Sequence, residues 1–257
     1  MRIVQVLARL AFAGFAAALL IALSGGFGKQ LGFWTYQTGF RMLEWGVYVG
    51  IAALALGLAW AAVAIYTNDG RAMNWGIAGM IGAAVVIGFP VYGYYAAKTV
   101  PPIHDITTDI AHPPQFRALL ALRKADGAVN PPEYYGDTKI TWHGQTKTVA
   151  QWQRKYYTDI YTIRILTPPE KLYARALKAA KSMGWDIVAE SAKDGHIEAT
   201  DTTFFFGFTD DIAIRVRPSG MGARLDIRSE SRVGRSDIGK NAARIRAYIK
   251  ELADTKL

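Results

Sequence analysis

The 257-residue sequence contains no cysteine. Disulfide bonds, thiolate nucleophiles and cysteine metal sites are therefore excluded. Histidine is also scarce: the four histidines are scattered, and none has a second histidine at a ligand spacing such as i, i+4. A histidine-based zinc site is therefore not expected.

The sequence also lacks the short motifs that identify common enzyme classes. It has no Gly-x-Ser-x-Gly elbow, no phosphate-binding Walker loop and no His-Glu-x-x-His pair. We accordingly assign no catalytic residue and expect no cofactor. A hydrolase or lyase that uses an Asp/Arg-rich surface stays open as the alternative to a non-enzymatic protein.

Charged residues are rare in the first part of the chain. Residues 1–99 carry six basic and two acidic residues, whereas residues 100–257 carry 24 and 19. Three apolar windows fall in this part, at about 4–23, 46–66 and 77–97. About 20 apolar residues are enough to cross a bilayer as a helix. Residues 1–98 are therefore predicted to form a three-helix transmembrane anchor, with the lipid bilayer as the first partner.

The topology of this anchor rests on weaker signals. Ala22-Leu23-Ser24 would be an acceptable signal-peptide cleavage site, but the apolar stretch is longer than such peptides need, which favours an uncleaved helix. The two sides of the membrane would carry equal numbers of basic residues, so the positive-inside rule does not decide the orientation. The basic start at Arg2 favours a cytoplasmic N-terminus. The second and third windows contain no carboxylate and no basic residue, so they indicate an anchor and not a conduit. We expect a multi-pass protein of the inner membrane with a periplasmic or external soluble domain.

Paired prolines interrupt residues 99–158, at Pro101-Pro102, Pro113-Pro114 and Pro131-Pro132. This pattern predicts an irregular segment that wraps a globular core. Within it, the stretch from His104 to Asp109 offers an imidazole and two carboxylates. Local hydrogen bonds from its threonines favour a structural turn over a metal site, so no metal ligand is assigned.

From residue 159 the pattern becomes regular. A strand over 161–165 precedes a helix over 168–183, and four further strands follow before a closing helix that starts near Ser236. This order predicts an α+β domain over 159–257, in which an antiparallel sheet carries two helices on one face. The closing helix is expected to bury one stripe at helical spacing, formed by Ile238, Ala242, Ile245, Ile249 and Leu252.

Charges alternate with apolar residues in the last strands. Because Ile212, Ile214 and Val216 point to the core, the residues between them point to the opposite face, where Glu198 and Asp226 also lie. A cross-strand ladder of ion pairs would explain this pattern. Arginine forks beside a helix N-terminus would instead suit a phosphate or carboxylate. The candidate anion site consists of Arg215, Arg217, Arg228, Arg232, Arg235 and Ser236.

Several stretches resemble an uncharacterised bacterial family known as domain of unknown function 1499. The resemblance covers 101–116 and 197–217, and it is closest over 226–245, with Arg228-Ser229, Ser231-Arg232 and Gly234-Arg235-Ser236-Asp237. It implies a membrane-anchored protein of the cell envelope and no particular reaction. We therefore predict an envelope protein whose soluble domain binds an anionic lipid headgroup, an envelope polymer or a partner protein. Nucleic acid is not expected as a partner, because the domain would lie outside the cell.

Overall fold

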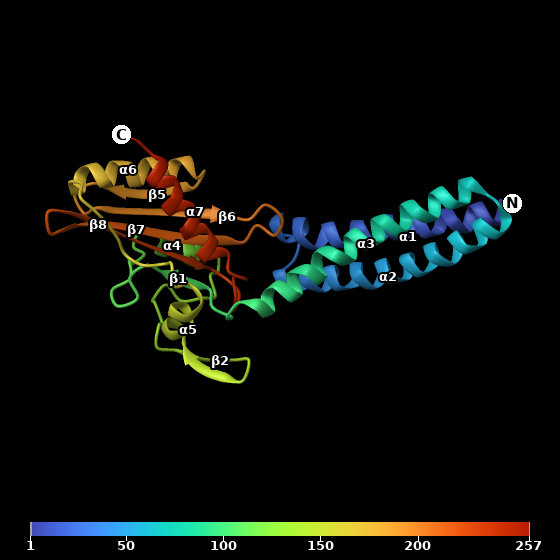
Figure 1. Cartoon of the computed structure of the whole chain (residues 1–257), viewed down its shortest axis with the longest axis horizontal. Helices are drawn as coiled ribbons and strands as arrows, with labels where there is room; N and C mark the ends of the chain where they lie inside the picture. The colour runs from blue at the N-terminus through green and yellow to red at the C-terminus, as the bar shows by residue number, and fades with distance from the viewer. Residues whose placement is uncertain (1, 257) are drawn as a thin grey trace. The chain divides into compact units, whose positions relative to one another are not determined.

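The computed structural model describes residues 2–256, so the outermost residues of the predicted ranges, Met1 and Leu257, lie outside the described part. The chain divides into two compact units. One holds the residues up to Ala96 together with 204–207, and the other holds 97–203 and 208 onward. Three long apolar helices come first and an antiparallel sheet with helices follows, which confirms the predicted α+β fold class (Figure 1).

The first unit is built from α1 (Arg2–Gln30), α2 (Tyr36–Thr67) and α3 (Gly70–Thr99). All three are long and apolar enough to cross a membrane. The helices extend beyond the predicted windows, so only residues 31–35 connect α1 to α2. The Thr35 hydroxyl accepts a hydrogen bond from the backbone N–H of Thr38 at the start of α2, and Asn68 ends that helix in the left-handed conformation.

Small residues let these helices approach one another closely. Gly46 of α2 lies against Ala18 and Ala22 of α1, and Gly79 of α3 lies against the backbone of Ala11. A side-chain carbon at Gly46 would come within 3.1 Å of Ala22 Cβ. Close backbone approach at glycine and alanine is a common basis of helix packing in membranes, where apolar burial alone drives little association.

Residues 204–207 belong to the same unit as the helices. The Phe27 ring centroid lies 5.7 Å from that of Phe204 and 5.5 Å from that of Phe205, both edge to face. Lys29 Nζ donates a hydrogen bond of 2.7 Å to the Gly207 carbonyl. The chain therefore joins the two units both in the last turn of α3 and at this aromatic loop.

The second unit is organised around a six-stranded antiparallel sheet in the order β1-β8-β7-β6-β5. β1 pairs with one half of β8, and β4 pairs antiparallel with the other half. β1 comes from the segment predicted to be irregular, and its three residues form a strand only because β8 lies beside them. The strands are β1 (Asp105–Thr107), β4 (Ile163–Ile165), β5 (Asp186–Ser191), β6 (His196–Thr202), β7 (Thr209–Ser219) and β8 (Gly222–Ser231).

Shorter elements complete this unit. A separate hairpin of β2 (Lys139–Trp142) and β3 (Gln145–Thr148) turns at His143 and Gly144, which have φ of 45° and 71°. Positive φ at both central residues is the geometry of a two-residue hairpin turn. The hairpin leads into α5 (Val149–Tyr156), which begins with a capping box between Thr148 and Gln151. A single short helix, α4 (Leu119–Ala125), lies earlier in the chain.

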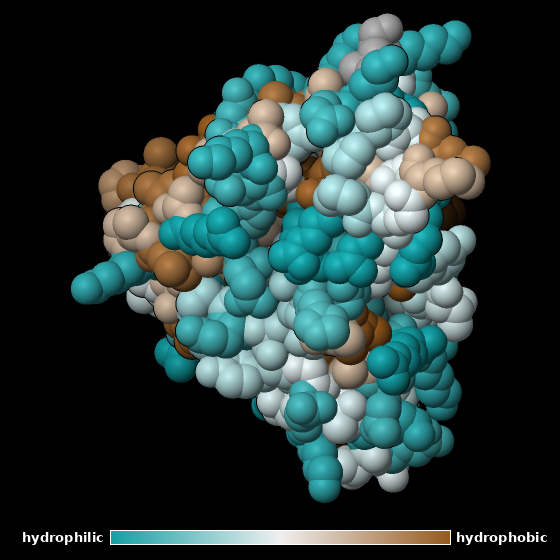
Figure 2. Space-filling model, turned by 90° about the vertical axis from the view of Figure 1, so that its left-hand side faces the viewer, coloured by the Kyte–Doolittle hydropathy of each residue, from teal (hydrophilic) through white to brown (hydrophobic). Residues whose placement is uncertain are grey.

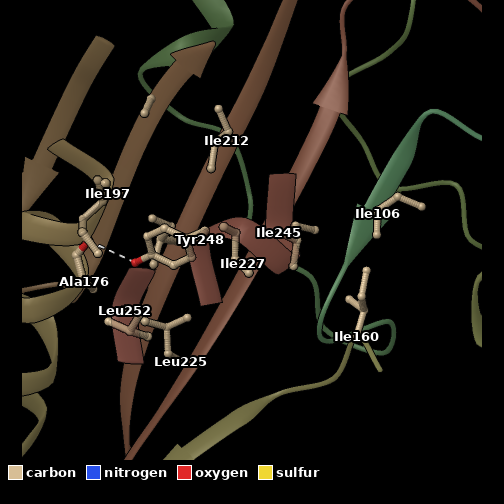
Figure 3. Packing of buried hydrophobic residues seen from close by; sticks show 14 of the residues in the cluster. Ile106, Ile160, Ala176, Ile197, Ile212, Leu225, Ile227, Ile245, Tyr248 and Leu252 are labelled. Carbon is tan, nitrogen blue, oxygen red and sulfur yellow. Dashed lines mark hydrogen bonds between the residues drawn. The ribbon is translucent and has the colours of Figure 1, made fainter. Parts of the chain in front are cut away.

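Helices α6 (Pro169–Ser182) and α7 (Lys240–Asp254) cover one face of the sheet. Ile245 and Tyr248 of α7 are fully buried in this core, and Figure 3 shows them among isoleucines and leucines of the strands. The Tyr248 hydroxyl donates a hydrogen bond of 3.0 Å to the Ala176 carbonyl of α6. The hydroxyl therefore has a partner inside an otherwise apolar layer.

The start of the closing helix differs from the prediction. α7 begins at Lys240 and not near Ser236, and Ile238 is 48% exposed with φ 55°. The reason is a cap: the Asp237 carboxylate accepts hydrogen bonds from the N–H groups of Gly239 and Asn241, at 2.7 and 2.8 Å. Ile238 therefore lies outside the buried stripe, whereas Ala242, Ile245 and Leu252 belong to it.

Candidate functional site

The sheet face opposite α6 and α7, here called the polar face, carries most of the charged residues of β6, β7 and β8; Asp201 and Asp210 lie on the helix face and pair with Arg244 of α7. Strand register places them in rows: Glu198 stands opposite Ala213, Arg215 opposite Asp226, and Asp211 opposite Glu230. The alternation read from the sequence therefore assigns these side chains to the correct face. It left open whether that face is exposed.

The middle of the polar face is covered by the segment that contains α4. Phe116 and Leu119 are buried and pack against Ala213 of β7. The guanidinium carbon of Arg228 lies 4.5 Å from the centre of the Phe116 ring. An arginine on an aromatic face gains about 1–2 kcal/mol when the pair is desolvated. The predicted wrapping segment thus turns a charged sheet face into a second, polar interior.

Arg228 has no exposed surface. Its Nε and Nη2 donate to the two carboxylate oxygens of Asp105 at 3.0 and 2.8 Å, and Nη2 also donates to Glu230 at 3.1 Å. Strand position alone favours Asp226 or Glu198 as the partner of Arg228, because both lie on the same face of the sheet. β1 supplies Asp105 instead, because it lies directly beside β8.

Two more arginines share one buried carboxylate. Arg123 of α4 donates to Asp211 at 2.5 Å and to Glu230 at 3.0 Å. Arg232 donates to the other oxygen of Asp211 at 2.6 Å and also pairs with Asp126. Asp211 is fully buried, so these contacts replace its water shell completely.

Arg215 completes the network. Its Nη2 donates to Asp226 at 2.8 Å, to Asp109 at 3.1 Å and to the His112 carbonyl at 2.7 Å. The Thr162 hydroxyl donates to the remaining oxygen of Asp226 at 2.6 Å. The His104–Asp109 stretch therefore supplies both of its carboxylates to arginines of the sheet. Within residues 2–256 no group of three or more metal-ligating side chains comes together.

Glu198 has a different set of partners. The backbone N–H groups of Arg117, Ala118 and Leu119 donate to its carboxylate at 2.9–3.1 Å, and His196 Nε2 lies 3.0 Å away. Burial raises the pKa of this carboxyl, but the hydrogen bonds from His196 and from the three N–H groups outweigh burial and lower the pKa. The ionised Glu198 carboxylate therefore holds the start of α4 against the sheet.

The network carries more acid than base. Arg123, Arg215, Arg228 and Arg232 pair with six carboxylates. Burial raises the pKa of Glu230 to about 8, with the charge of Asp105 adding to the effect and Arg228 and Arg123 opposing it. A free anion would meet this acidic excess and not unpaired arginines. The geometry matches the hypothesis of a ladder of ion pairs. The ladder also includes partners from segments that are distant in the sequence.

The six predicted anion-site residues are not brought together. Arg215, Arg228 and Arg232 are buried in the network, while Arg217 and Arg235 are exposed. Eight positions separate Arg224, the strand partner of Arg217, from Arg232 along β8, a span of about 25 Å. Arg217 and Arg235 therefore lie near opposite ends of the sheet, and anion binding by the six as a set stays a prediction.

The predicted helix N-terminus is already occupied. Asp237 holds the N–H groups that an external anion near Ser236 would use. Burial raises the pKa of Asp237 to about 6, while the hydrogen bonds from Asn241 and Gly239 lower it. The Ser236 hydroxyl accepts a hydrogen bond from the N–H of Ile238 at 3.2 Å. This end of the sheet thus offers exposed charge at Arg235 but no open helix terminus.

Sequence reasoning missed the partners Asp105, Asp109, Arg123 and Asp126. The paired prolines marked their segment as one that wraps the core, but spacing gave no sign of which strand each residue would meet. It also missed Arg164 and Arg224 as neighbours of Arg217, although all three belong to predicted strands.

An open groove of about 520 Å³ borders the network, lined by 108–111 and by residues between 153 and 162. Asp109 is the carboxylate in this lining, and it is paired with Arg215. A hydrolase would need a free acid or base here. Because Asp109 is already paired with Arg215, it is not free to act as that acid or base.

The family described as "Protein of unknown function (DUF1499)" matches residues 105–252, which is more than half of the chain. The chain belongs to this family. The match begins at β1 and ends in α7, so it spans the sheet, its covering segment and the whole ion-pair network. No curated protein matches the chain.

Proposed function

We propose that this DUF1499 member is a multi-pass protein of the bacterial inner membrane whose soluble unit lies on the periplasmic side and binds an anionic group of the envelope. The three apolar helices support the membrane anchor. The basic start of the first helix supports a cytoplasmic N-terminus, and an odd number of crossings then puts the soluble unit on the other side.

The observation that carries the binding proposal is the position of Arg235 along the chain. His104 follows Thr99, the last residue of α3, by five residues. Five extended residues reach at most about 18 Å. His104 Nδ1 lies 3.5 Å from the Arg235 carbonyl, and the Ile103 carbonyl accepts from Asp237. The short connection therefore restricts how far the exposed Arg235 can move from the last turn of a membrane-spanning helix.

Lys240 adds a second exposed charge next to this loop. A basic residue near an anionic leaflet contributes about 1 kcal/mol of attraction within a Debye length. Such attraction needs no pocket. It is therefore compatible with the loop over 232–239, which precedes α7 and in which Asp237 already caps the helix N-terminus. We therefore name anionic phospholipid headgroups as the ligand of Arg235 and Lys240.

A binding role is favoured over a hydrolase or lyase. The Asp/Arg surface that an enzyme would have used is a closed set of ion pairs beneath Phe116 and Leu119. The buried carboxylates of this network are held in ion pairs with arginines, so they are not free to act on a substrate as a general acid or base.

A probe attached near the loop tests the proposal. Since the chain has no cysteine, Ala243→Cys in the exposed first turn of α7 gives a single labelling position. We expect a spin label there, in the full chain in nanodiscs, to become more accessible to a lipid-bound relaxation agent when anionic lipid is added. The change should disappear at high salt and in an Arg235→Ala/Lys240→Ala background.

A label at Met221→Cys, where the native side chain is 95% exposed in the β7–β8 turn, is the matched control. It should respond little to lipid charge. An equal response at both positions, or none at Ala243→Cys, would contradict headgroup binding by this loop.

A further inference from the structure

Three arginines form a row across β4, β8 and β7. Arg164 stands directly opposite Arg224, and Arg224 stands directly opposite Arg217. Directly paired residues of antiparallel strands project from the same face, with Cβ atoms about 5 Å apart. Three guanidinium groups are therefore attached along about 10 Å of sheet, on the polar face and beyond the segment that covers its middle.

This row has fewer acidic partners than the buried network. Arg224 Nε lies 3.8 Å from Asp226, but that carboxylate also receives Arg215 and Thr162 at 2.8 and 2.6 Å. In the described part of the chain, neither Arg164 nor Arg217 has an ion pair. Like charges directly opposite one another destabilise a sheet, so the row stays under repulsion unless something neutralises it.

A fourth arginine adds to the positive charge. Partial burial lowers the pKa of Arg217, and the charges of Arg215, Arg224 and Arg117 lower it further, against the opposing effect of Asp226. Arg117, Arg164 and Arg217 are exposed, and the Arg224 side chain is 26% exposed. Figure 2 looks onto this end of the soluble unit, where hydrophilic residues cover most of the surface between separate apolar patches.

We propose that Arg164, Arg217 and Arg224 bind a multiply charged anion of the phosphate class. Arginine forks match phosphate oxygens in two-point hydrogen bonds, and a row of this length suits two linked anionic groups better than one. The ligand would relieve repulsion that the chain itself leaves uncompensated. This site goes beyond the headgroup attraction proposed for Arg235 and uses a separate set of residues.

The row lies at the end of the sheet away from both connections to the first unit. Both connections to the first unit leave the same end of the sheet. At the aromatic loop, the Thr203 N–H donates to the Phe208 carbonyl; after α3, the His104 carbonyl accepts from the N–H of Ser231 at the end of β8. Arg224 lies about 25 Å along β8 from that end. We assign the row to a soluble phosphate compound or a phosphate-bearing polymer, and competition by anionic vesicles tests lipid headgroups as the other source of the same chemistry.

Pyrophosphate is the probe that tests the site, with inorganic phosphate as a singly phosphorylated comparison. The full chain is reconstituted in nanodiscs of phosphatidylcholine, and binding is measured by calorimetry at low salt. We expect pyrophosphate to bind more tightly than phosphate. Arg164→Ala/Arg217→Ala should raise its Kd at least about tenfold, the loss expected for removing charged hydrogen bonds.

Lys171→Ala/Lys250→Ala removes the same charge from exposed positions of α6 and α7, on the other face of the sheet, and should leave the Kd within about twofold. Without ligand, Arg164→Ala/Arg217→Ala should melt at the same temperature as the native chain or higher, because repulsion is relieved. A lower melting temperature would show a structural role for these arginines and overturn the assignment.

Three other results would also overturn it: no pyrophosphate binding to the native chain, equal weakening in both double variants, and displacement of pyrophosphate by vesicles of anionic phospholipid as effectively as by free phosphate. The Ala243→Cys accessibility measurement does not involve these arginines, so the two proposals can fail separately.

Discussion

Arg228 and Asp105 form a two-point ion pair between β8 and β1, at 3.0 and 2.8 Å, although 123 positions separate them in the chain. The Arg228 side chain has no exposed surface and that of Asp105 is 9% exposed. This pair connects the segment that follows the membrane helices to the centre of the sheet.

Removing one partner of this pair should destabilise the protein strongly. We expect Arg228→Ala to lower the free energy of unfolding by about 3–5 kcal/mol, because Asp105 would be left as a buried charge without its ion-pair partner and Glu230 would keep only Arg123. Arg246→Ala breaks an ion pair to Asp159 whose side chains are 43% and 53% exposed. That control should cost at most about 1 kcal/mol. Thermal unfolding of the full chain in detergent measures both, and equal effects would contradict the buried network.

The boundary of α7 gives a matched pair of substitutions. Ile245→Asp should prevent folding of the soluble unit, because it buries an unpaired carboxylate in the apolar core at a cost of several kcal/mol. Ile238→Asp changes a residue that is 48% exposed and lies outside the helix, so we expect a change in melting temperature of a few degrees at most. Protease resistance and circular dichroism can separate the two outcomes. A comparable loss of folded structure in both variants would show that Ile238 belongs to the buried stripe.

Stability should depend on pH through Glu230. Its pKa is raised to about 8 in the folded chain, from an ordinary value of 4.5. Between these values the folded state binds more protons than the unfolded state, so this group's contribution to stability falls as the pH rises. Glu230→Gln keeps a hydrogen-bond acceptor and cannot ionise. The stability of Glu230→Gln relative to the native chain should therefore increase from pH 5 to pH 8 in denaturant unfolding, and a constant difference would refute the raised pKa.

The orientation of the soluble unit can be tested in intact cells. A membrane-impermeant maleimide should label Met221→Cys directly, if the unit is periplasmic. Arg71→Cys, in the first turn of α3, should react only after the inner membrane is opened. Reporter fusions after Lys98 and at Leu257 should agree. Labelling with the reverse pattern would place the soluble unit in the cytoplasm.

Much of the architecture follows from local sequence. Three apolar windows specify the membrane helices, because a helix needs only its own length and composition to satisfy its backbone in lipid. Strand alternation placed Arg215 and Arg228 on the same face. The order of strands and helices after residue 159 also follows from periodicity and from turn residues such as Gly184 and Gly195.

Only the tertiary structure decided which of those charges are available to a ligand. Alternation fixes the face of a side chain, but exposure of that face depends on whether another segment lies over it. Here residues 105–126, in which local patterns indicated a short helix over 113–124 but no strand and no partners, supply β1, Phe116 and the carboxylates that neutralise Arg215 and Arg228. Cross-strand register then left Arg164, Arg217 and Arg224 side by side, with one long ion pair between Arg224 and Asp226 in the described part of the chain. Pairing between distant segments is set by packing of the whole domain, and residue spacing within one strand carries no information about it.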